Sequence, residues 1–301
     1  MQKIKKLLYS QRIAPYVFIL PFILTFLIFF VYPLISTVKM SFQDILPGKV
    51  EWVGLKNYQR LLGDKVFGQA VYNSVRYMVI TCALLIPFPL LFAYMISSKS
   101  MKFGEVFKSV YFVPVLSSVV VAGIIFRMMF SELPGAMMNS LLALFGKPAI
   151  IWMKLEYPSV LALVLLCCWR WTGMNMLYYL AGLKSIPNDL YEAADIDGAG
   201  PVQKFLHIGW PLLKPTTIYV LTISIYAGLA MFTESYMIYG NNNSAHNYGL
   251  TIVGYLYRYG FEKLRMGYAS SVGLVLLVTT MAINLTQLRL TGTIGRRRDK
   301  V

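Results

Sequence analysis

Residues 183–215 read LKSIPNDLYEAADIDGAGPVQKFLHIGWPLLKP, a polar stretch set between two long apolar runs. Its pattern predicts two short helices joined by a tight turn. Pro187 suits the first position of a helix, because a proline there loses no hydrogen bond. Gly198 and Gly200 are typical of a helix end, and Pro201 can begin the second helix. The stretch is therefore expected to form a helical connection outside the apolar runs.

The first of these helices is predicted to have two distinct faces. Carboxylates at Asp189, Glu192 and Asp195 follow its early face, where they favour the positive end of the helix dipole. The spacing i, i+3, i+4 and i+7 defines a second face of Leu190, Ala193, Ala194 and Asp197. Its alanines permit close approach of another protein, whereas anionic lipid headgroups would repel the acids. We therefore favour a protein partner over the alternative of a helix that rests on the membrane surface.

The rest of the chain is too apolar for a soluble domain. Of its 301 residues, 57% are hydrophobic and only 14% are charged, so most of the surface is expected to meet lipid. A membrane-spanning helix needs about 20 mainly apolar residues. By that measure the sequence predicts an all-α, polytopic membrane protein with six spans, at roughly 13 to 36, 73 to 96, 106 to 130, 158 to 181, 213 to 234 and 267 to 289.

The distribution of basic residues predicts the orientation of these spans. An even number of spans places both termini on one side of the membrane. The segments on that side hold 15 Lys and Arg residues, against 10 on the other side. Because basic loops stay in the cytoplasm, we expect both termini and the 183–215 stretch to be cytoplasmic. The net charge of +15 is thus an orientation signal, and nucleic-acid binding is not expected.

The spacing within the polar stretch closely resembles a known signature. Glu192-Ala193-Ala194, then Gly198, then Ile208, and then Trp210-Pro211 are similar to the EAA motif of permease subunits in binding-protein-dependent ABC importers. The family has leucine where this chain has Trp210. The resemblance implies that residues 187–200, here named the coupling segment, hold a coupling helix that sits in a groove of a cytoplasmic ATPase. The residues that would transmit ATP-driven closure are Leu190, Glu192, Ala193, Ala194, Asp197 and Gly198.

The N-terminal third extends the resemblance over nearly the whole chain. Segments 14–33, 41–42 and 52–58 look like carbohydrate permeases of the maltose and glycerol-phosphate importer group, and among these like the first of two paired permeases. The maltose-type first subunit has additional N-terminal helices and a large external domain, which this chain lacks. The resemblance implies one transmembrane domain over 1–301: a tail (1–12), a first helix with an external segment (13–72), core helices with the coupling segment (73–289) and a basic tail (290–301).

The same resemblance implies a set of partners and a location. A second, related permease would form a heterodimer with this chain. Two ATPase subunits would bind to its cytoplasmic side, and an external or periplasmic solute-binding protein would deliver a carbohydrate, with a di- or oligosaccharide favoured. The location implied is the bacterial cytoplasmic membrane, with the chain crossing the lipid several times.

No catalytic or cofactor motif stands out in the sequence. It has no Gly-x-x-x-x-Gly-Lys-Ser/Thr phosphate loop, so ATP and Mg²⁺ are expected on the partner ATPase. Its three cysteines and two histidines suggest no metal cluster. We therefore expect a translocation subunit that is not itself an enzyme, has no catalytic or metal-ligating residues and binds no cofactor.

A secondary transporter or channel without an ATPase is the main alternative. Such proteins commonly place ionisable groups inside their spans. The candidates here are Arg76, Arg127, Arg170 and Glu234, which we interpret as side chains that snorkel from their spans to the interface. The EAA-like spacing favours the importer over this alternative.

Aromatic and amide side chains in the later spans are candidates for a sugar path. Aromatic faces and amide hydrogen bonds are the groups that bind sugars. Trp171, Asn175 and Tyr178 share one helical stripe at i, i+4 and i+7. The full candidate set is Trp171, Asn175, Tyr178, Tyr226 and Asn284. For each of them the competing interpretation is polar packing between helices.

Overall fold

The computed structural model describes residues 11, 13–97, 101, 103–241 and 244–294. Its contacts divide the chain into two compact units: residues 1–63 with 256–275, and residues 64–255 with 276–301. Most of the predicted basic tails, 1–12 and 290–301, lies outside the described residues. Each unit is described by itself below.

The first unit begins with a long apolar helix. Pro33 has no N–H to donate to the carbonyl four residues earlier, and the helix widens into a π-helical turn just before it. None of the side chains in 14–40 is buried. The helix is made of α2 (Ala14–Phe26), η1 (Leu27–Val31) and α3 (Tyr32–Ser41).

A small hairpin follows this helix, which the all-helical prediction did not include. Strands β1 (Gln43–Leu46) and β2 (Lys49–Trp52) pair antiparallel, with Gln43 opposite Trp52. Gly48 has φ +78°, which glycine adopts without strain in the turn between them. Helix α4 (Lys56–Gly63) comes next. Its Asn57 Nδ2 donates to the carbonyls of Ser41 and Gln43, both at 2.9 Å, and so fixes the hairpin to the helix.

Three later elements complete the first unit. They are the end of α16 (Ile252–Tyr257), the π-helical turn η4 (Arg258–Glu262) and the first ten residues of α17 (Met266–Leu290). A Cβ on Gly267 would lie 1.8 Å from the Gln43 carbonyl oxygen. Only glycine therefore allows α17 to pack this closely against the start of the hairpin.

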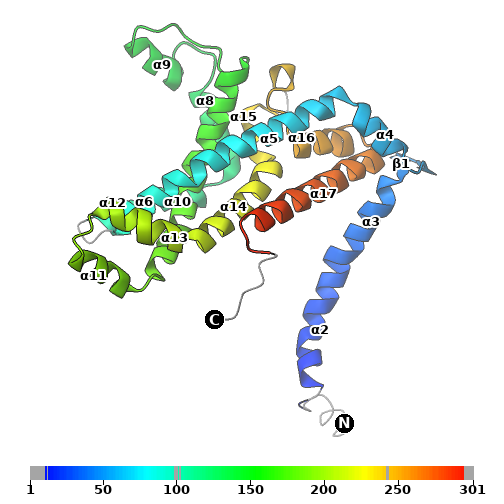
Figure 1. Ribbon diagram of the computed structural model, residues 1–301. Coiled ribbons are helices and arrows are strands. Elements are labelled where there is room, and N and C mark those ends of the chain that lie inside the picture. The colour runs from blue at the N-terminus through cyan, green and yellow to red at the C-terminus, as the bar shows by residue number, and fades with distance from the viewer. Residues whose placement is uncertain (1–10, 12, 98–100, 102, 242–243, 295–301) are drawn as a thin grey trace, which may run out of the picture. The chain divides into compact units, whose positions relative to one another are not determined.

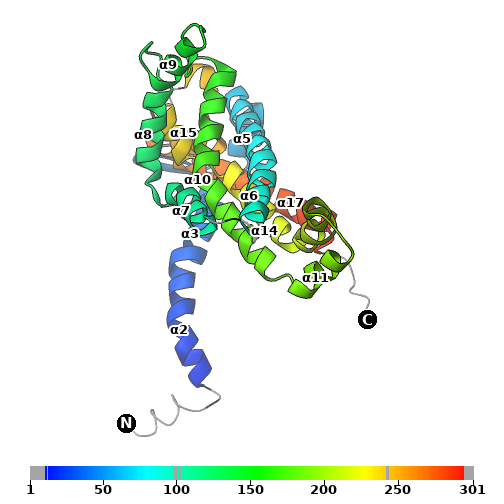
Figure 2. The ribbon, with the colours of Figure 1, turned by 90° about the vertical axis from the view of Figure 1, so that its left-hand side faces the viewer.

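The second unit is a bundle of helices, and α10 is the longest of them. In Figures 1 and 2, α9 and α11 lie at opposite ends of this unit, and α10 runs between them. The elements of this unit that precede α16 are α5 (Lys65–Leu85), α6 (Pro87–Ser97), α7 (Gly104–Leu116), α8 (Val119–Met129), α9 (Met137–Leu144), α10 (Glu156–Lys184), α11 (Asn188–Ile196), α12 (Pro201–Lys204), η2 (Phe205–Gly209), α13 (Trp210–Leu212), α14 (Lys214–Leu229), α15 (Thr233–Ile238) and η3 (Ala245–Asn247).

The predicted spans correspond to these helices, with two of them bent. Among the described residues, four helices are long and apolar enough to cross a membrane, and two bent pairs bring the number to six if each pair is one span. The four helices are Ala14–Ser41, Lys65–Ser97, Glu156–Lys184 and Met266–Leu290, and the pairs are Gly104–Leu116 with Val119–Met129 and Pro201–Leu212 with Lys214–Leu229.

The bent pairs differ from the straight spans that were predicted. The span at 106 to 130 turns by 95° between α7 and α8. Ser117 and Ser118 are extended there, and the Ser117 hydroxyl donates to the Pro114 carbonyl at 2.6 Å, so it partly replaces the helical hydrogen bonds that end at this point. The span at 213 to 234 ends early, at Leu229, and its last residues belong to α15.

The core of the second unit forms along α10. One buried cluster joins α10 to α5, α8 and α15, and includes Tyr77, Ala122, Leu166 and Ile238. A second joins it to α6 and α14, and includes Leu90, Met176, Tyr179 and Val220. Small residues bring the helices close together: a Cβ on Gly173 would lie 1.9 Å from the Tyr111 carbonyl oxygen of α7.

This close approach of α10 to α7 predicts a stability difference between two glycines. Gly173→Ala would push α7 away from α10 and is expected to lower the free energy of unfolding by about 1–3 kcal/mol, as overpacking does. Gly68→Ala is the matched control, because nothing lies within 4 Å of a Cβ there, and helix propensity should raise stability by up to ~1 kcal/mol. Thermal unfolding in detergent measures both, and equal shifts would contradict the packing described.

Candidate functional site

The coupling segment folds as the short helix α11 (Asn188–Ile196). Pro187 is extended, with ψ 132°, and immediately precedes the helix. The prediction that Pro187 takes the first helical position is therefore off by one residue. Helix α11 begins only three residues after the end of α10, with 185–187 between them, so the end of α10 constrains where α11 lies.

The end of α11 is a Schellman turn that depends on glycine. Gly198 has φ +74°, its N–H donates to the Asp195 carbonyl at 3.1 Å, and the Ala199 N–H donates to the Ala194 carbonyl at 2.9 Å. Gly198 thus ends the helix as predicted. Gly200 instead is the N-cap of α12, where its N–H donates to Gln203 Oε1 at 2.8 Å, and Pro201 is the first residue of α12 as predicted.

The predicted coupling residues are mostly exposed. None of the side chains of α11 is buried. Glu192, Ala193, Asp197 and Gly198 are exposed, as is Leu190 at 43%, and Ala194 is half-buried. The structure therefore brings these six residues together on one small helix and its terminal turn, with a surface that is free within this chain.

Contacts on the other side hold the segment to the bundle. Asp195 forms an ion pair with Lys204 of α12. The Tyr94 hydroxyl of α6 donates to the Pro201 carbonyl at 2.8 Å, and its ring packs on Phe205 at 4.7 Å. Tyr191 packs against the same cluster, where burial raises the pKa of its phenol. A movement of this segment would therefore act on α6 as well as on α10.

The three candidate sugar-path residues of α10 have separate partners. Asn175 is buried, and its Nδ2 donates to the Leu85 carbonyl at 3.0 Å. That carbonyl has no helical donor, because Pro89 stands four residues later. Tyr178 meets the Tyr219 ring edge to face at 5.2 Å. Trp171 is half-buried, with the Arg170 guanidinium 5.6 Å from its ring centroid.

The two remaining path candidates lie on other helices. Tyr226 of α14 is 61% exposed. Asn284 of α17 is half-buried and donates to the Thr280 carbonyl of its own helix at 3.1 Å. Within the described part of the chain, no hydrogen bond joins either residue to Trp171, Asn175 or Tyr178. The five candidates therefore do not form one hydrogen-bonded site in this chain.

Two ion pairs between helices of the bundle were missed by the sequence analysis. Arg170 of α10 and Glu234 of α15 form a pair at 2.9 Å, with side chains only 9% and 14% exposed. Arg76 of α5 pairs with Glu156 at the start of α10. The interpretation that Arg170 and Glu234 snorkel to the interface is wrong, because they are turned into the protein. Arg127, by contrast, is exposed at the end of α8.

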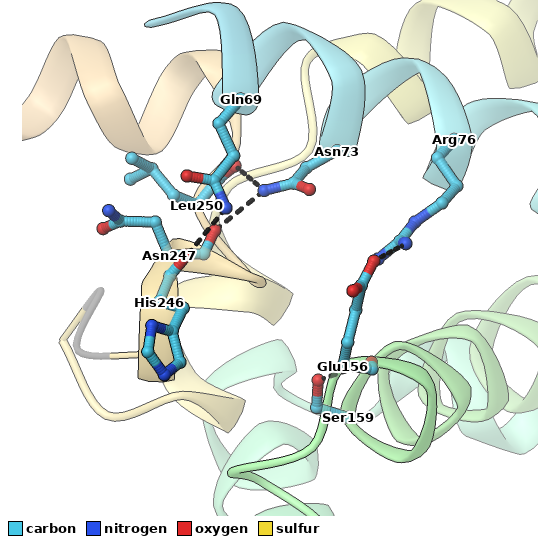
Figure 3. Close-up of polar contacts among 8 residues, drawn as sticks. All are labelled: Gln69, Asn73, Arg76, Glu156, Ser159, His246, Asn247 and Leu250. Atoms are coloured by element: carbon cyan, nitrogen blue, oxygen red, sulfur yellow. Dashed lines mark hydrogen bonds and ion pairs between the residues drawn. The ribbon is translucent and has the colours of Figure 1, made fainter. Parts of the chain in front are cut away.

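A polar network, drawn in Figure 3, anchors the loop between α15 and α16, which lies at the end of the bundle away from α11 (Figure 1). Gln69 Nε2 of α5 donates to the His246 carbonyl at 2.6 Å. One turn later, Asn73 Nδ2 donates to the carbonyls of Asn247 and Leu250 at 2.8 and 3.0 Å. His246 and Asn247 both have positive φ, a strained form that these contacts help to maintain. The i, i+4 spacing of the two amides was the only sequence signal for this network.

This network predicts a large effect of Asn73 on the order of the loop. Asn73→Leu removes the amide donor from the buried Leu250 carbonyl and one of the donors to the Asn247 carbonyl, which is expected to destabilise the loop conformation by about 1–3 kcal/mol. Hydrogen exchange of residues 244–251 should then be faster. Gln69→Leu is the matched control, because its hydrogen bond is exposed and its loss should have a smaller effect. Equal exchange in the two variants would contradict this assignment.

The described residues contain no group of three or more His, Cys, Asp or Glu side chains that could hold a metal ion.

Comparison with known proteins was made by sequence and by fold. The family model "Binding-protein-dependent transport system inner membrane component" matches residues 7–300. The chain is 50% identical, over 96% of its length and 91% of the relative, to the arabinooligosaccharides transport system permease protein AraP of Bacillus subtilis. It is 45% identical to the AraP protein of Halalkalibacterium halodurans, over 94% of this chain and 89% of the relative.

The fold is also similar to solved structures. A crystal structure of a bacterial ABC transporter involved in the import of the acidic polysaccharide alginate superposes with a TM-score of 0.84, at 24% identity, over 94% of this chain and 96% of that one. The bacterial alginate ABC transporter in complex with an alginate pentasaccharide-bound periplasmic protein gives the same TM-score, over 93% and 94% of the two chains. At this identity the likeness concerns the fold.

Proposed function

This chain belongs to the family of binding-protein-dependent transport system inner membrane components, and from that premise we propose how it couples ATP to import and what it imports. It is an integral membrane permease subunit of an ABC importer. The alternative of a secondary transporter or channel does not fit this family. For this subunit we propose the partners, the orientation in the membrane and the solute.

The coupling segment is the site where this chain meets its ATPase. The observation that carries this proposal is the exposure of α11, which has no buried side chain. Its position is nevertheless fixed by the ion pair of Asp195 with Lys204, by Tyr191 packed against the bundle and by the Schellman turn at Gly198. A helix that is held by its own chain on one face and is exposed on the other face is suited to dock in a groove of a partner. ATP and Mg²⁺ are bound by that partner, and this chain holds no cofactor.

A second permease completes the path across the membrane. The described residues of α2, η1 and α3 include ten or more large apolar side chains that are exposed, and Phe22, Phe26 and Phe30 stack along one side with centroids 6.3 and 5.2 Å apart. Such a ridge packs well on another helix in the membrane. The candidate sugar-path residues, which form no single site in this chain, would be completed by the related permease in a heterodimer.

The proposed orientation follows from the coupling segment. The ATPases are cytoplasmic, so α11 lies on the cytoplasmic side of the bacterial cytoplasmic membrane. With six spans, both termini are then cytoplasmic. The loop held by Gln69 and Asn73 lies on the outside, where an external solute-binding protein delivers the solute. The solved alginate transporter includes such a periplasmic protein.

The solute proposed is an oligosaccharide, with arabinose-containing oligosaccharides as the first candidates. Two relatives that share 50% and 45% of their residues with this chain over almost its full length are arabinooligosaccharide permeases. Of the five path candidates, Trp171, Tyr178 and Tyr226 offer aromatic faces on which a sugar ring can stack, and Asn284 offers an amide. Closure of the ATPases moves the coupling segment and α10, and thereby exposes the path alternately to the two sides.

Purification and reconstitution test this proposal. The chain is affinity-tagged and extracted gently from its native membrane, and the co-purified proteins are identified by mass spectrometry. A related permease and an ATPase are expected. The complex is then placed in liposomes with the solute-binding protein, and uptake of labelled arabino-oligosaccharides is measured with ATP or with a non-hydrolysable analogue. Recovery of the chain alone, or uptake without ATP, would contradict the importer.

A further inference from the structure

The Arg170–Glu234 pair lies at the middle of the longest helix. Arg170 is fourteen residues from each end of α10, about 21 Å along the helix axis at 1.5 Å per residue. This is about half the thickness of the membrane, including the headgroups. The guanidinium also lies 5.6 Å from the Trp171 ring centroid, and its Nε is buried with no hydrogen-bond partner. The pair thus lies near the middle of a helix that is long and apolar enough to cross the membrane.

Stability alone does not explain a charged pair at this place. The transfer of two charged groups out of water is costly, and two apolar side chains of similar volume commonly hold a protein core together equally well. Around the pair, such packing is already present, because Tyr77, Leu166 and Ile238 belong to the same buried cluster. What an ion pair adds to apolar packing is a fixed register, since charged atoms meet at one place only.

The pair joins two elements that could otherwise slide past each other. Glu234 is in the first turn of α15, which begins after a break of three residues at the end of α14. On its other side α15 packs closely on α8, where a Cβ on Gly123 would lie 2.5 Å from Met237 Cβ. Arg170 belongs to α10, which runs unbroken to the residues before the coupling segment. The pair is therefore the polar link between the helix that the ATPase moves and an element that is separate from it in sequence.

We propose that Arg170 and Glu234 are positioning residues for transport: the pair locks α15 to α10, so that α15 follows the ATP-driven movement of α10. This rests on the proposed importer function and goes beyond it, because neither residue belongs to the coupling segment or to the candidate sugar path. Without the pair, α10 still moves when the ATPases close, but α15 and the α8 helix packed on it lag behind. ATP is then hydrolysed with little transport.

The test measures solute taken up per ATP hydrolysed by the reconstituted complex. Glu234→Gln and Arg170→Gln are expected to lower this ratio about tenfold, within the range that coupling free energies give. The charge swap Arg170→Glu with Glu234→Arg should restore it to within about threefold of the wild type. The apolar double variant Arg170→Met with Glu234→Leu should assemble and hydrolyse ATP, yet remain about tenfold low.

The outcomes separate positioning from plain structural support. A structural role predicts that the apolar double variant has the wild-type ratio, and that result would overturn the proposal, as would wild-type ratios in both single variants. Should the swap fail to assemble, Arg170→Lys keeps the charge and is expected within about threefold of the wild type; a loss equal to that of Arg170→Gln would again overturn it.

A second ion pair provides the matched control. Lys154 and Glu132 pair at 2.8 Å but are 62% and 38% exposed, and Glu132→Gln should leave the ratio unchanged. Failure of this inference also differs from failure of the proposed function. If the wild-type complex shows no ATP-dependent uptake, the importer proposal fails; if it does and the variants match it, only the positioning role fails.

Discussion

Gly198→Val is expected to lower ATP-dependent uptake about tenfold or more while the chain still inserts into the membrane. A side chain at φ +74° costs roughly 1–2 kcal/mol, and β-branched valine is among the least tolerant residues there. Since 1.4 kcal/mol is tenfold in an equilibrium constant, the equilibrium between the closed and the open turn shifts about tenfold towards the open form. The loss is one of backbone geometry, because nothing lies within 4 Å of a Cβ at this position.

Gly198→Asn is the matched control for this result. Asparagine adopts the left-handed conformation far more readily than valine, and its side chain has room. It should therefore retain most of the uptake at similar expression, as judged by immunoblot of membranes and by uptake of labelled oligosaccharide. If both variants transport like the wild type, the Schellman turn has no part in coupling.

Ala193→Arg is expected to separate the ATPase from the permease. Ala193 is exposed on α11, so the arginine is tolerated in this chain and clashes only in the groove of the partner. Overpacking costs about 1–3 kcal/mol, which is roughly a tenfold to hundredfold loss of affinity. The amount of ATPase that co-purifies with the tagged chain measures the effect directly.

The same substitution elsewhere isolates the contribution of the site. Ala143 is exposed on α9, at the end of the bundle away from α11 (Figures 1 and 2). Ala143→Arg should leave the co-purified ATPase unchanged. A loss of ATPase in both variants would indicate general misassembly, and retention in both would mean that α11 does not enter the groove in the manner proposed.

The long helices and the coupling segment were predictable because their signals are local. Apolar runs of about 20 residues have few alternatives to a membrane helix, and the end of α11 is encoded by one glycine, Gly198. The prolines can also be read from the sequence, but the backbone conformation that each one produces depends on its surroundings. Pro33 leads to a π-helical turn within a continuous helix, whereas Pro114 precedes a 95° bend. The difference lies in Ser117 and Ser118, which follow Pro114 and have an extended backbone.

The contacts that were missed join residues far apart in the chain. Arg170 and Glu234 are 64 residues apart, and both were interpreted as interfacial side chains, although only Glu234 lies at an end of its predicted span and Arg170 lies near the middle of the span at 158 to 181. The span at 213 to 234 in fact stops at Leu229, so Glu234 belongs to a separate helix that turns its carboxylate inward. No periodicity in a single sequence contains that information. The hairpin at 43–52 was missed for another reason: its strands have four residues each.

The amide of Asn175 substitutes for a backbone N–H that Pro89 lacks. Its hydrogen bond to the Leu85 carbonyl means that a side chain on one helix completes the backbone of another. Mutational drift at the two positions is therefore linked. Loss of the Asn175 amide leaves the buried Leu85 carbonyl without its donor. Loss of Pro89 supplies a backbone N–H that competes with the amide for the same carbonyl. Among descendants of this sequence, Pro89 and Asn175 should therefore be either both kept or both replaced.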